Sequence, residues 1–165
     1  MNYTVRNAVS ADLPRIEEIY AIARDFMEKT GNPNQWGKTN PPHDWLVDDI
    51  EKKLLYVITD EDRIHGVFYF YIGEDPTYGE IEDGTWHSSE PYGTIHRIAS
   101  DGSGGILHTA VEFCESLSDN IRIDTHHDNI VMQNAVAKLG FKRSGIIHLA
   151  NGSPRIAYER ITQTA

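Results

Sequence analysis

The chain has 165 residues, of which 39% are hydrophobic and 24% charged, a balance typical of one soluble globular domain over residues 1–165. Its formal net charge of −10 argues against nucleic acid or an anionic membrane as a partner, because either would need a basic face. The first ten residues lack the apolar core of a secretion signal, and no apolar run approaches membrane-spanning length. We therefore expect a cytoplasmic protein.

The N-terminal part of the chain predicts a strand, a long helix and a long loop. Residues 3–7 alternate as a strand does, and Ser10 is placed to cap the helix that follows and ends at Gly31. The apolar face of this helix consists of Leu13, Ile16, Tyr20, Ala23 and Met27. Residues 31–43 are rich in Gly, Pro and Asn and carry Trp36. The length of this loop fits two interpretations equally well: a functional loop, or a surface loop pinned by one tryptophan.

The next segment predicts a short helix over residues 44–53 and two strands over residues 54–60 and 64–72. The second strand is apolar on both faces, which indicates a central strand covered on both sides. Between this strand and residue 93, the chain is polar and glycine-punctuated, with a short strand expected around residues 80–82.

A strand, a glycine-rich turn and an amphipathic helix follow in residues 93–100, 101–105 and 106–116. The glycines of the turn are Gly102, Gly104 and Gly105, and without a Cβ they let the backbone turn sharply and approach a ligand closely. Since a helix N-terminus presents unpaired N–H groups, this turn is a candidate site for phosphate or pyrophosphate. Ordinary turn chemistry explains the glycines about equally well.

Two well-known nucleotide motifs do not fit this turn. A P-loop needs a Lys-Ser/Thr pair where Ile106 and Leu107 stand. The dinucleotide fingerprint needs the GxGxxG spacing, which GSGG does not provide. A nucleotide-dependent phosphotransferase is therefore not supported.

The C-terminal part predicts a strand over residues 120–125, a helix capped by Asn129 and ended by Gly140, and a hairpin of residues 141–149 and 154–161 around an Asn-Gly turn. The chain contains no internal repeat and no linker that would divide it. The order of elements indicates a single mixed α/β sheet with helices on both faces.

A metal site at His126 and His127, with Asp124 and Asp128, is disfavoured because adjacent histidines after a strand are expected to diverge to opposite sides. We expect no metal. The basic residues near the last helix, which are Lys138, Lys142 and Arg143, are interpreted as a solvated cluster.

The order of elements resembles that of the GCN5-related N-acetyltransferase (GNAT) family, and three stretches carry the likeness locally. SADLPRIEEIY resembles the family's first-helix entry, IHRIAS with its glycine turn resembles its acetyl-CoA motif, and IDTHHDNIVMQNAVAKLGFKRSG resembles the strand, helix and exit that follow. The resemblance covers essentially the whole chain. It implies a single GNAT-like domain with a mixed, mostly antiparallel sheet that is splayed at the cofactor site, helices on both faces, and acetyl-CoA as co-substrate.

The resemblance also implies roles for particular residues. The strand backbone at Ile98, Ala99 and Ser100 matches the part that pairs with the pantetheine arm, and the Ile98 amide is the expected donor to the thioester carbonyl, an oxyanion-hole role. The pyrophosphate would meet the turn and the first helical residues, which are Gly102, Ser103, Gly104, Gly105, Ile106 and Leu107. Asn129 matches the family's cofactor-side asparagine.

Two positions depart from the family pattern. Asp101 stands where a basic residue usually precedes the glycines, so pyrophosphate binding is expected to rest on amides and Ser103. Val136 stands where many members carry a tyrosine that protonates the leaving thiolate, so the general acid is missing or elsewhere.

His96 is the candidate general base, because acetyl transfer to an amine needs a group that removes the ammonium proton and histidine titrates in the range that suits this role. It lies two residues before Ile98, so the strand period predicts that both side chains share one face. A packed strand histidine is the alternative reading, and Glu82 or Asp83 acting through water is a further one. The candidates for acceptor binding are Trp36, Tyr69, Tyr71 and Glu82.

The sequence thus predicts an acyltransferase that moves an acetyl group from acetyl-CoA to a small-molecule amine by direct attack in a ternary complex. No nucleophile is placed for a covalent intermediate, because Cys114 lies on an apolar helix face and reads as a buried structural thiol. A non-catalytic acyl-CoA-binding or sensor domain of the same fold is the alternative. A homodimer is left open.

Overall fold

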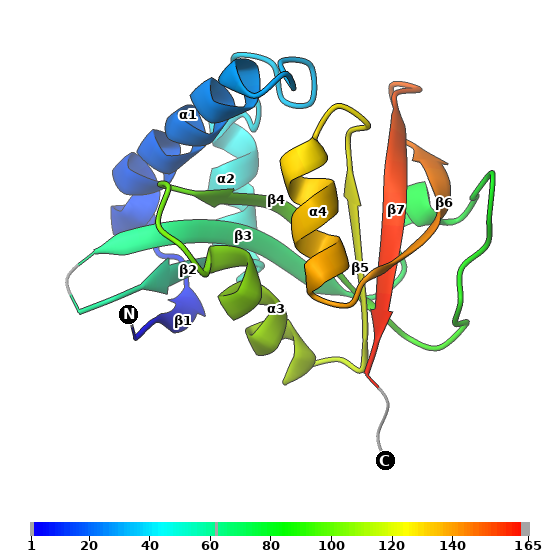
Figure 1. Ribbon diagram of the computed structural model, residues 1–165. Helices are drawn as coiled ribbons and strands as arrows, with labels where there is room; N and C mark the ends of the chain where they lie inside the picture. The colour runs from blue at the N-terminus through cyan, green and yellow to red at the C-terminus, as the bar shows by residue number, and fades with distance from the viewer. Residues whose placement is uncertain (1, 62, 163–165) are drawn as a thin grey trace.

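The computed structural model describes residues 2–61 and 63–162, which form one seven-stranded sheet with helices on both faces (Figure 1). The strands are β1 (Thr4–Asn7), β2 (Leu55–Thr59), β3 (Ile64–Ile72), β4 (Gly93–Ser100), β5 (Asn120–Thr125), β6 (Lys142–His148) and β7 (Pro154–Ile161). The helices are α1 (Leu13–Lys29), α2 (His43–Glu51), α3 (Ile106–Glu115) and α4 (Ile130–Lys138), with short 3-10 turns η1 (Ser10–Asp12) and η2 (Pro76–Tyr78). Every long element expected from the sequence is present. The long loop that begins at Gly31 contains no helix or strand before α2 starts at His43.

The strand order is β1-β2-β3-β4-β5-β7-β6, and among the described strands β4 and β5 form a parallel pair while the other neighbours are antiparallel. The parallel pairing is short: it runs from Gly93 opposite Ile121 to Ile95 opposite Ile123. Beyond Ile95, β4 continues to Ser100, and none of the described strands pairs with it on that side. The sheet is therefore mixed, mostly antiparallel and splayed in its middle, as the sequence predicted.

Apolar side chains fill both faces of the sheet. On one face, α3 and α4 pack Ile106, Ala110 and Val136 against strand residues such as Phe68 and Ile121. On the other face, α1 and α2 form a second core with β2 and β3, whose buried members include Ile16, Ile19, Tyr20, Leu46 and Val67. Figure 1 views the sheet with α3 and α4 in front of it. The double coverage of β3 confirms its predicted place at the centre.

The entry to α1 differs from the prediction that Ser10 caps it. Residues Ser10–Asp12 form a 3-10 turn, and Asp12 takes the position before the helix. The Asp12 carboxylate accepts the Val9 N–H at 2.8 Å and pairs with Arg6 at 2.8 Å, so it stabilises the turn that Ser10 was expected to hold. The cap of α4 is confirmed, because the Asn129 Oδ1 accepts the Met132 N–H at 3.0 Å.

A β-bulge interrupts β4 at its centre. His96 lies opposite Tyr69 and Ala99 lies opposite Val67, so two residues of β4 face a single residue of β3. Arg97, within the bulge, has φ of 52°, a left-handed conformation that is uncommon outside glycine.

The bulge reverses the order of faces along β4. Ile95 and Ile98 pack into the same core under α3 and α4, whereas Ala99 packs into the core under α1 and α2. His96 is directed to the side of Tyr69, which packs against that second core. The prediction that His96 and Ile98 share a face is therefore wrong, because it assumed an unbroken period of two.

The segment between β3 and β4 packs beside the C-terminal strands. Around residues 80–82 the predicted strand is reduced to an isolated bridge between Glu82 and Ile146. Nearby, the buried Arg122 side chain is stacked between the rings of Trp86 and Tyr92, at 3.9 Å and 3.8 Å from their centroids, and pairs with Glu159 at 3.1 Å. These contacts hold the segment that supplies Asp75 to the site described below.

The prediction for Cys114 is confirmed: the thiol is buried on α3, and burial raises its pKa. In the described part of the chain, no helix combines the length and the apolar character needed to cross a membrane.

Candidate active site

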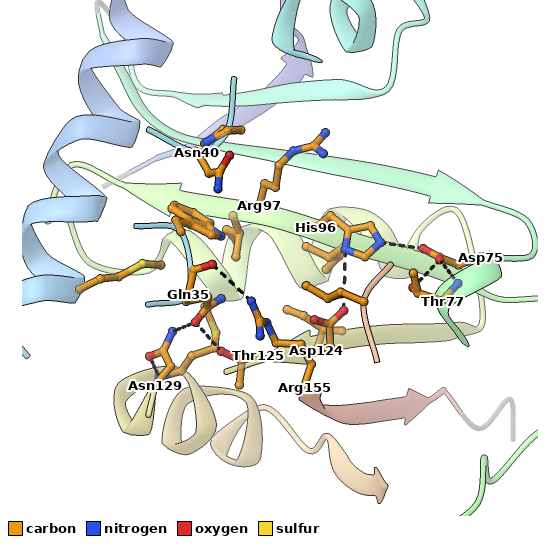
Figure 2. Close-up of a pocket in the computed structure, with 18 of the residues that line it drawn as sticks. Gln35, Asn40, Asp75, Thr77, His96, Arg97, Asp124, Thr125, Asn129 and Arg155 are labelled. Carbon is orange, nitrogen blue, oxygen red and sulfur yellow. Dashed lines mark hydrogen bonds and ion pairs between the residues drawn. The ribbon is translucent and has the colours of Figure 1, made fainter. Parts of the chain in front are cut away.

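A cleft of about 530 Å³ opens where β4 and β5 separate (Figure 2). The splayed strands form its floor, and the loop of residues 31–43, the start of α4, the turn between β6 and β7, and the segment around η2 form its walls. Four residues singled out in the sequence line it: Trp36, His96, Ile98 and Asn129. The splay of the sheet thus creates the cavity and brings the candidate base into it.

The His96 imidazole lies between two carboxylates. Its Nε2 is 2.7 Å from the Asp75 Oδ2, and its Nδ1 is 3.8 Å from the Asp124 Oδ2 (Figure 2). A quarter of its side-chain surface remains exposed, 25% by area, so a ligand in the cleft can reach the ring. The role of general base and the alternative of a packed strand histidine both remain predictions.

Asp75 fixes which nitrogen of His96 is available. Its Oδ1 accepts hydrogen bonds from the Thr77 N–H at 2.9 Å and the Thr77 hydroxyl at 2.7 Å. Burial raises the pKa of the Asp75 carboxyl, but the hydrogen bonds from His96 and Thr77 outweigh it and lower the pKa to about 2. An ionised Asp75 can only accept, so the His96 Nε2–H donates to it. In the neutral imidazole the lone pair is then on Nδ1, on the side of Asp124.

Asp124 completes a negatively charged pair around the ring. The Tyr78 hydroxyl donates to the Asp124 Oδ2 at 2.6 Å. Burial, followed by the charge of Asp124, raises the pKa of Tyr78 well above its ordinary value, so the phenol keeps its proton and remains a donor. A cationic ammonium placed near His96 would therefore meet the Nδ1 lone pair and an adjacent carboxylate.

The contacts of Arg97 hold the bulge that positions His96. The Arg97 carbonyl accepts the buried Tyr20 hydroxyl at 2.8 Å, and its guanidinium pairs with Asp49 and lies 4.8 Å from the centroid of the Tyr69 ring. The Tyr69 ring is in turn 5.7 Å from the His96 ring. A left-handed residue other than glycine costs about 1 kcal/mol or more, and these contacts maintain it. Tyr69, expected to bind the acceptor, is not among the residues that line the cleft and instead packs beside the His96 ring.

The glycine turn is held by an internal network built on Asp101. The Asp101 carboxylate accepts the Ser103 N–H at 3.0 Å, pairs with Arg15 at 2.7 Å and lies 2.8 Å from the His65 Nδ1. The hydrogen bond to Asp101 raises the pKa of His65, against the opposing effect of burial. Arg15 on α1 and His65 on β3 thus provide the cationic partners of Asp101. His65, near the start of β3, is thus a structural partner of this turn.

The start of α3 keeps its amides available. The first intrahelical bond of α3 runs from the Thr109 N–H to the Gly105 carbonyl at 3.0 Å, so the N–H groups of Ile106 and Leu107 precede the helical ladder. Gly105 has φ of 80°, which glycine adopts without strain. A Cβ built on Gly104 would meet no atom within 4 Å. The turn therefore presents an open, positively polarised surface, although the Ser103 amide is already engaged by Asp101.

The Gln35 side chain connects the long loop to β5 and α4 across the cleft. The Gln35 Oε1 accepts from the Asn129 Nδ2 at 3.0 Å and the Thr125 hydroxyl at 3.2 Å. Trp36 packs edge-on against Tyr20, with their ring centroids 5.5 Å apart. Both polar ends of Asn129 are thus used within the protein, one on Gln35 and one on the cap of α4. Its predicted contact with a cofactor remains a prediction.

Several candidate residues do not line this cleft. Tyr71 is exposed on β3, and Glu82 is exposed where its backbone bridges to β6. The cofactor candidates other than Ile98 and Asn129 also lie outside the cleft, at the end of β4, in the turn that follows it and at the start of α3. They are Ala99, Ser100, Gly102, Ser103, Gly104, Gly105, Ile106 and Leu107. Val136 is completely buried in the core under α4, so that position offers no general acid.

The histidine pair differs from expectation. The rings of His126 and His127 do not diverge but stack, with centroids 4.3 Å apart. With Asp128 they bring potential metal-ligand atoms within 4.8 Å of one another. The His126 Nδ1, however, accepts the Asp128 N–H at 3.0 Å, and Asp124 is directed to Tyr78. The expectation that the site needs no metal remains a prediction.

Sequence reasoning missed Asp75, Gln35 and Arg155 in the cleft. Asp75 had a detectable signal, because Asp followed by Pro76 is a typical start of a helical turn. For Gln35 and Arg155 no sequence pattern pointed to the cleft, since each is placed there by contacts between distant segments. One such contact is the hydrogen bond that the Arg155 Nη2 donates to the Gln35 carbonyl at 3.3 Å.

No family model and no curated protein matches this chain in sequence. Solved structures do match. An acetyltransferase of the GNAT family from Streptococcus agalactiae is 28% identical, with 98% of this chain and 96% of that chain covered and a TM-score of 0.86. A GNAT-family acetyltransferase from Listeria monocytogenes is 19% identical, with 96% and 94% covered and a TM-score of 0.70. The structure of yncA from Salmonella typhimurium with acetyl-CoA is 14% identical, with 99% and 95% covered and a TM-score of 0.61.

Proposed function

We infer that this chain, which has the fold of the GNAT acetyltransferases, transfers an acetyl group from acetyl-CoA to the amine of a small molecule. The observation that carries the proposal is the Asp75–His96–Asp124 arrangement at the floor of the splayed cleft. It provides an oriented proton acceptor at the position where a fold of this kind opens its sheet. The acetyl-CoA in the structurally similar yncA supports the choice of acyl donor.

The residues at the end of β4 suit an acyl-CoA. The free side of β4 beyond Ile95 offers backbone groups to the pantetheine arm, and the amides of Ile106 and Leu107 offer a phosphate site at the N-terminus of α3. The open space at Gly104 fits close approach by a pyrophosphate, because a side chain there would occupy that surface. When bound, the co-substrate supplies the activated acetyl group.

The proposed chemistry at the amine begins with electrostatics. The carboxylates of Asp75 and Asp124 favour an ammonium next to His96, and Asp75 holds the Nε2–H. The Nδ1 lone pair then accepts a proton from the ammonium, which frees the nitrogen lone pair to attack the thioester carbonyl, and this is general-base catalysis. As the C–S bond breaks, CoA leaves as a thiolate and takes up the second proton that the nitrogen loses when the amide forms. The Ile98 amide is proposed to donate to the oxygen of the attacked carbonyl, where charge develops.

Transfer is proposed to be direct rather than through an acyl-enzyme. Cys114 is buried in the core, and burial raises the pKa of its thiol, so it is neither exposed nor ionised as a nucleophile must be. Both substrates are then bound together, with the amine on the His96 side of the splayed strands.

The proposal is tested by incubating the purified chain with acetyl-CoA and a panel of small amines and measuring free CoA thiol. Amine-dependent release of thiol supports the proposal. Acetyl-CoA should also raise the melting temperature in a concentration-dependent manner, more than ATP or NAD does. Binding without turnover on any amine would instead indicate the acyl-CoA sensor, and no binding of any acyl-CoA would contradict both.

A further inference from the structure

The cleft contains a buried cation that has no carboxylate partner in the described part of the chain. The Arg155 side chain comes from β7, and the residue is only 6% exposed. Its guanidinium donates to neutral oxygens: the Nη1 to the Pro154 carbonyl at 3.0 Å and to the Ser153 hydroxyl, and the Nη2 to the Gln35 carbonyl at 3.3 Å. The other cleft arginine, Arg97, has its own carboxylate in Asp49.

A buried charge without a counterion is costly, and buried cations in proteins are usually paired. Burial accordingly lowers the pKa of Arg155, an effect that the charge of Asp124 partly offsets. Asp124 is not a direct partner, because its carboxylate is bound by the Tyr78 hydroxyl and faces His96. A guanidinium has five N–H donors, and the three bonds named above leave others free to bind an anion.

The unpaired cation and the base lie in the same cleft. Figure 2 shows the Arg155 guanidinium pointing from β7 toward Gln35, on the same side of the cleft as Asp124 and below His96. The cleft therefore offers two carboxylates and an imidazole together with a guanidinium. A ligand complementary to both carries an ammonium and an anionic group within one small molecule.

We propose that Arg155 binds the carboxylate of the acceptor, and that the acceptors of this protein are amino acids or closely related amino-carboxylates. The inference rests on the proposed acetyl transfer and specifies its substrate class. Arg155 is the specificity-determining residue, and Gln35 holds its guanidinium in place through the backbone carbonyl. The planar fork of arginine matches a carboxylate in a two-point contact, which lysine cannot reproduce.

The competing explanation is that Arg155 only braces the loop of residues 31–43 against β7 through Gln35. A brace would affect all acceptors equally when removed. A carboxylate-binding residue would affect only those acceptors that carry a carboxylate. The ratio of rates for matched acceptors therefore separates the two roles.

The test compares the twenty L-amino acids with their α-carboxamides, in which the carboxylate is neutral, by release of CoA thiol from acetyl-CoA. For the best acceptors, wild type should show kcat/KM about 10- to 100-fold higher for the acid than for the amide, the factor expected of a hydrogen-bonded charge pair. Arg155→Gln should bring this ratio close to one, and Arg155→Lys should restore only part of it. Arg143→Gln, which removes an arginine paired with Asp83 outside the cleft, is the matched control.

Equal kcat/KM for acids and amides in wild type would overturn the inference while leaving acetyl transfer intact. An acid-over-amide ratio that survives in Arg155→Gln would overturn it as well, in favour of a brace. Turnover of no amine at all, with acetyl-CoA bound, would overturn the proposed function and the inference with it. A wild-type ratio near one overturns the inference whatever the folding of the variants, and Arg155→Lys, which keeps the charge, serves as the second variant if Arg155→Gln folds poorly.

Discussion

Replacing Asp75 by Asn should change how the stability of the protein depends on acid. The substitution keeps the size of the side chain and an oxygen for Thr77 but removes the charge that faces the His96 Nε2. In the wild type, the hydrogen bonds from His96 and Thr77 outweigh burial and lower the pKa of Asp75 from 3.8 to about 2. A carboxyl with this difference between unfolded and folded states stabilises the native state by about 2 kcal/mol once it is ionised.

The sign of the effect follows from the direction of the shift. Because the folded pKa is the lower one, the contribution is present above the unfolded value of 3.8 and is lost as the pH falls toward 2. Urea unfolding of wild type and Asp75→Asn at intervals from pH 6 to pH 2.5 measures it. The wild type should lose about 2 kcal/mol more than the variant over this range.

The exposed Asp83, which pairs with Arg143, provides the control, and Asp83→Asn should follow the wild type. Parallel loss of stability in wild type and Asp75→Asn would show that the pair with His96 does not form as described. In the acetyl-transfer assay, Asp75→Asn should also lower kcat, because the amide can present its N–H to the imidazole and so favour the wrong tautomer.

Three further outcomes follow from the geometry. Gly104→Val should weaken acetyl-CoA binding in calorimetry with little change in melting temperature, because a Cβ at this position meets no atom within 4 Å. Tyr20→Phe should lower the free energy of unfolding by about 1 kcal/mol in urea titrations, since it leaves the Arg97 carbonyl in the bulge without its donor. His65→Gln should flatten the loss of stability as the pH rises above 6.5, because the hydrogen bond to Asp101 raises the pKa of His65 and its contribution is lost as the pH passes that raised value. Equal acetyl-CoA affinity for the first variant, or wild-type behaviour for either of the others, would contradict the corresponding contact.

The order and type of the long elements could be predicted from sequence because each depends on local periodicity. The apolar repeat of α1, the unbroken apolar run of β3 and the Asn129 cap of α4 are all encoded within a few residues. The Ser10 cap was wrong because Asp12, two residues further on, takes the position before the helix and is held there by Arg6.

The candidate site could be predicted only in part. His96 was found because a histidine on the strand before the glycine turn suits a base, but its face was assigned incorrectly, since the bulge at Arg97 depends on Tyr20 and Asp49 from two other elements. Asp75 and Arg155 reach the cleft from segments 21 residues before and 59 residues after His96. No local pattern encodes such contacts, and only the folded chain brings them together.

The measurement that tests the central claim most directly is the single-turnover rate of acetyl transfer in His96→Gln, alongside the affinity of the variant for acetyl-CoA. If the His96 Nδ1 accepts the proton of the amine, the variant should bind acetyl-CoA as the wild type does and transfer it roughly 10²- to 10⁴-fold more slowly. Glu82→Gln and Asp83→Asn, at exposed carboxylates outside the cleft, should keep rates near wild type. An unchanged rate in His96→Gln, or a large loss in either carboxylate variant, would contradict the account.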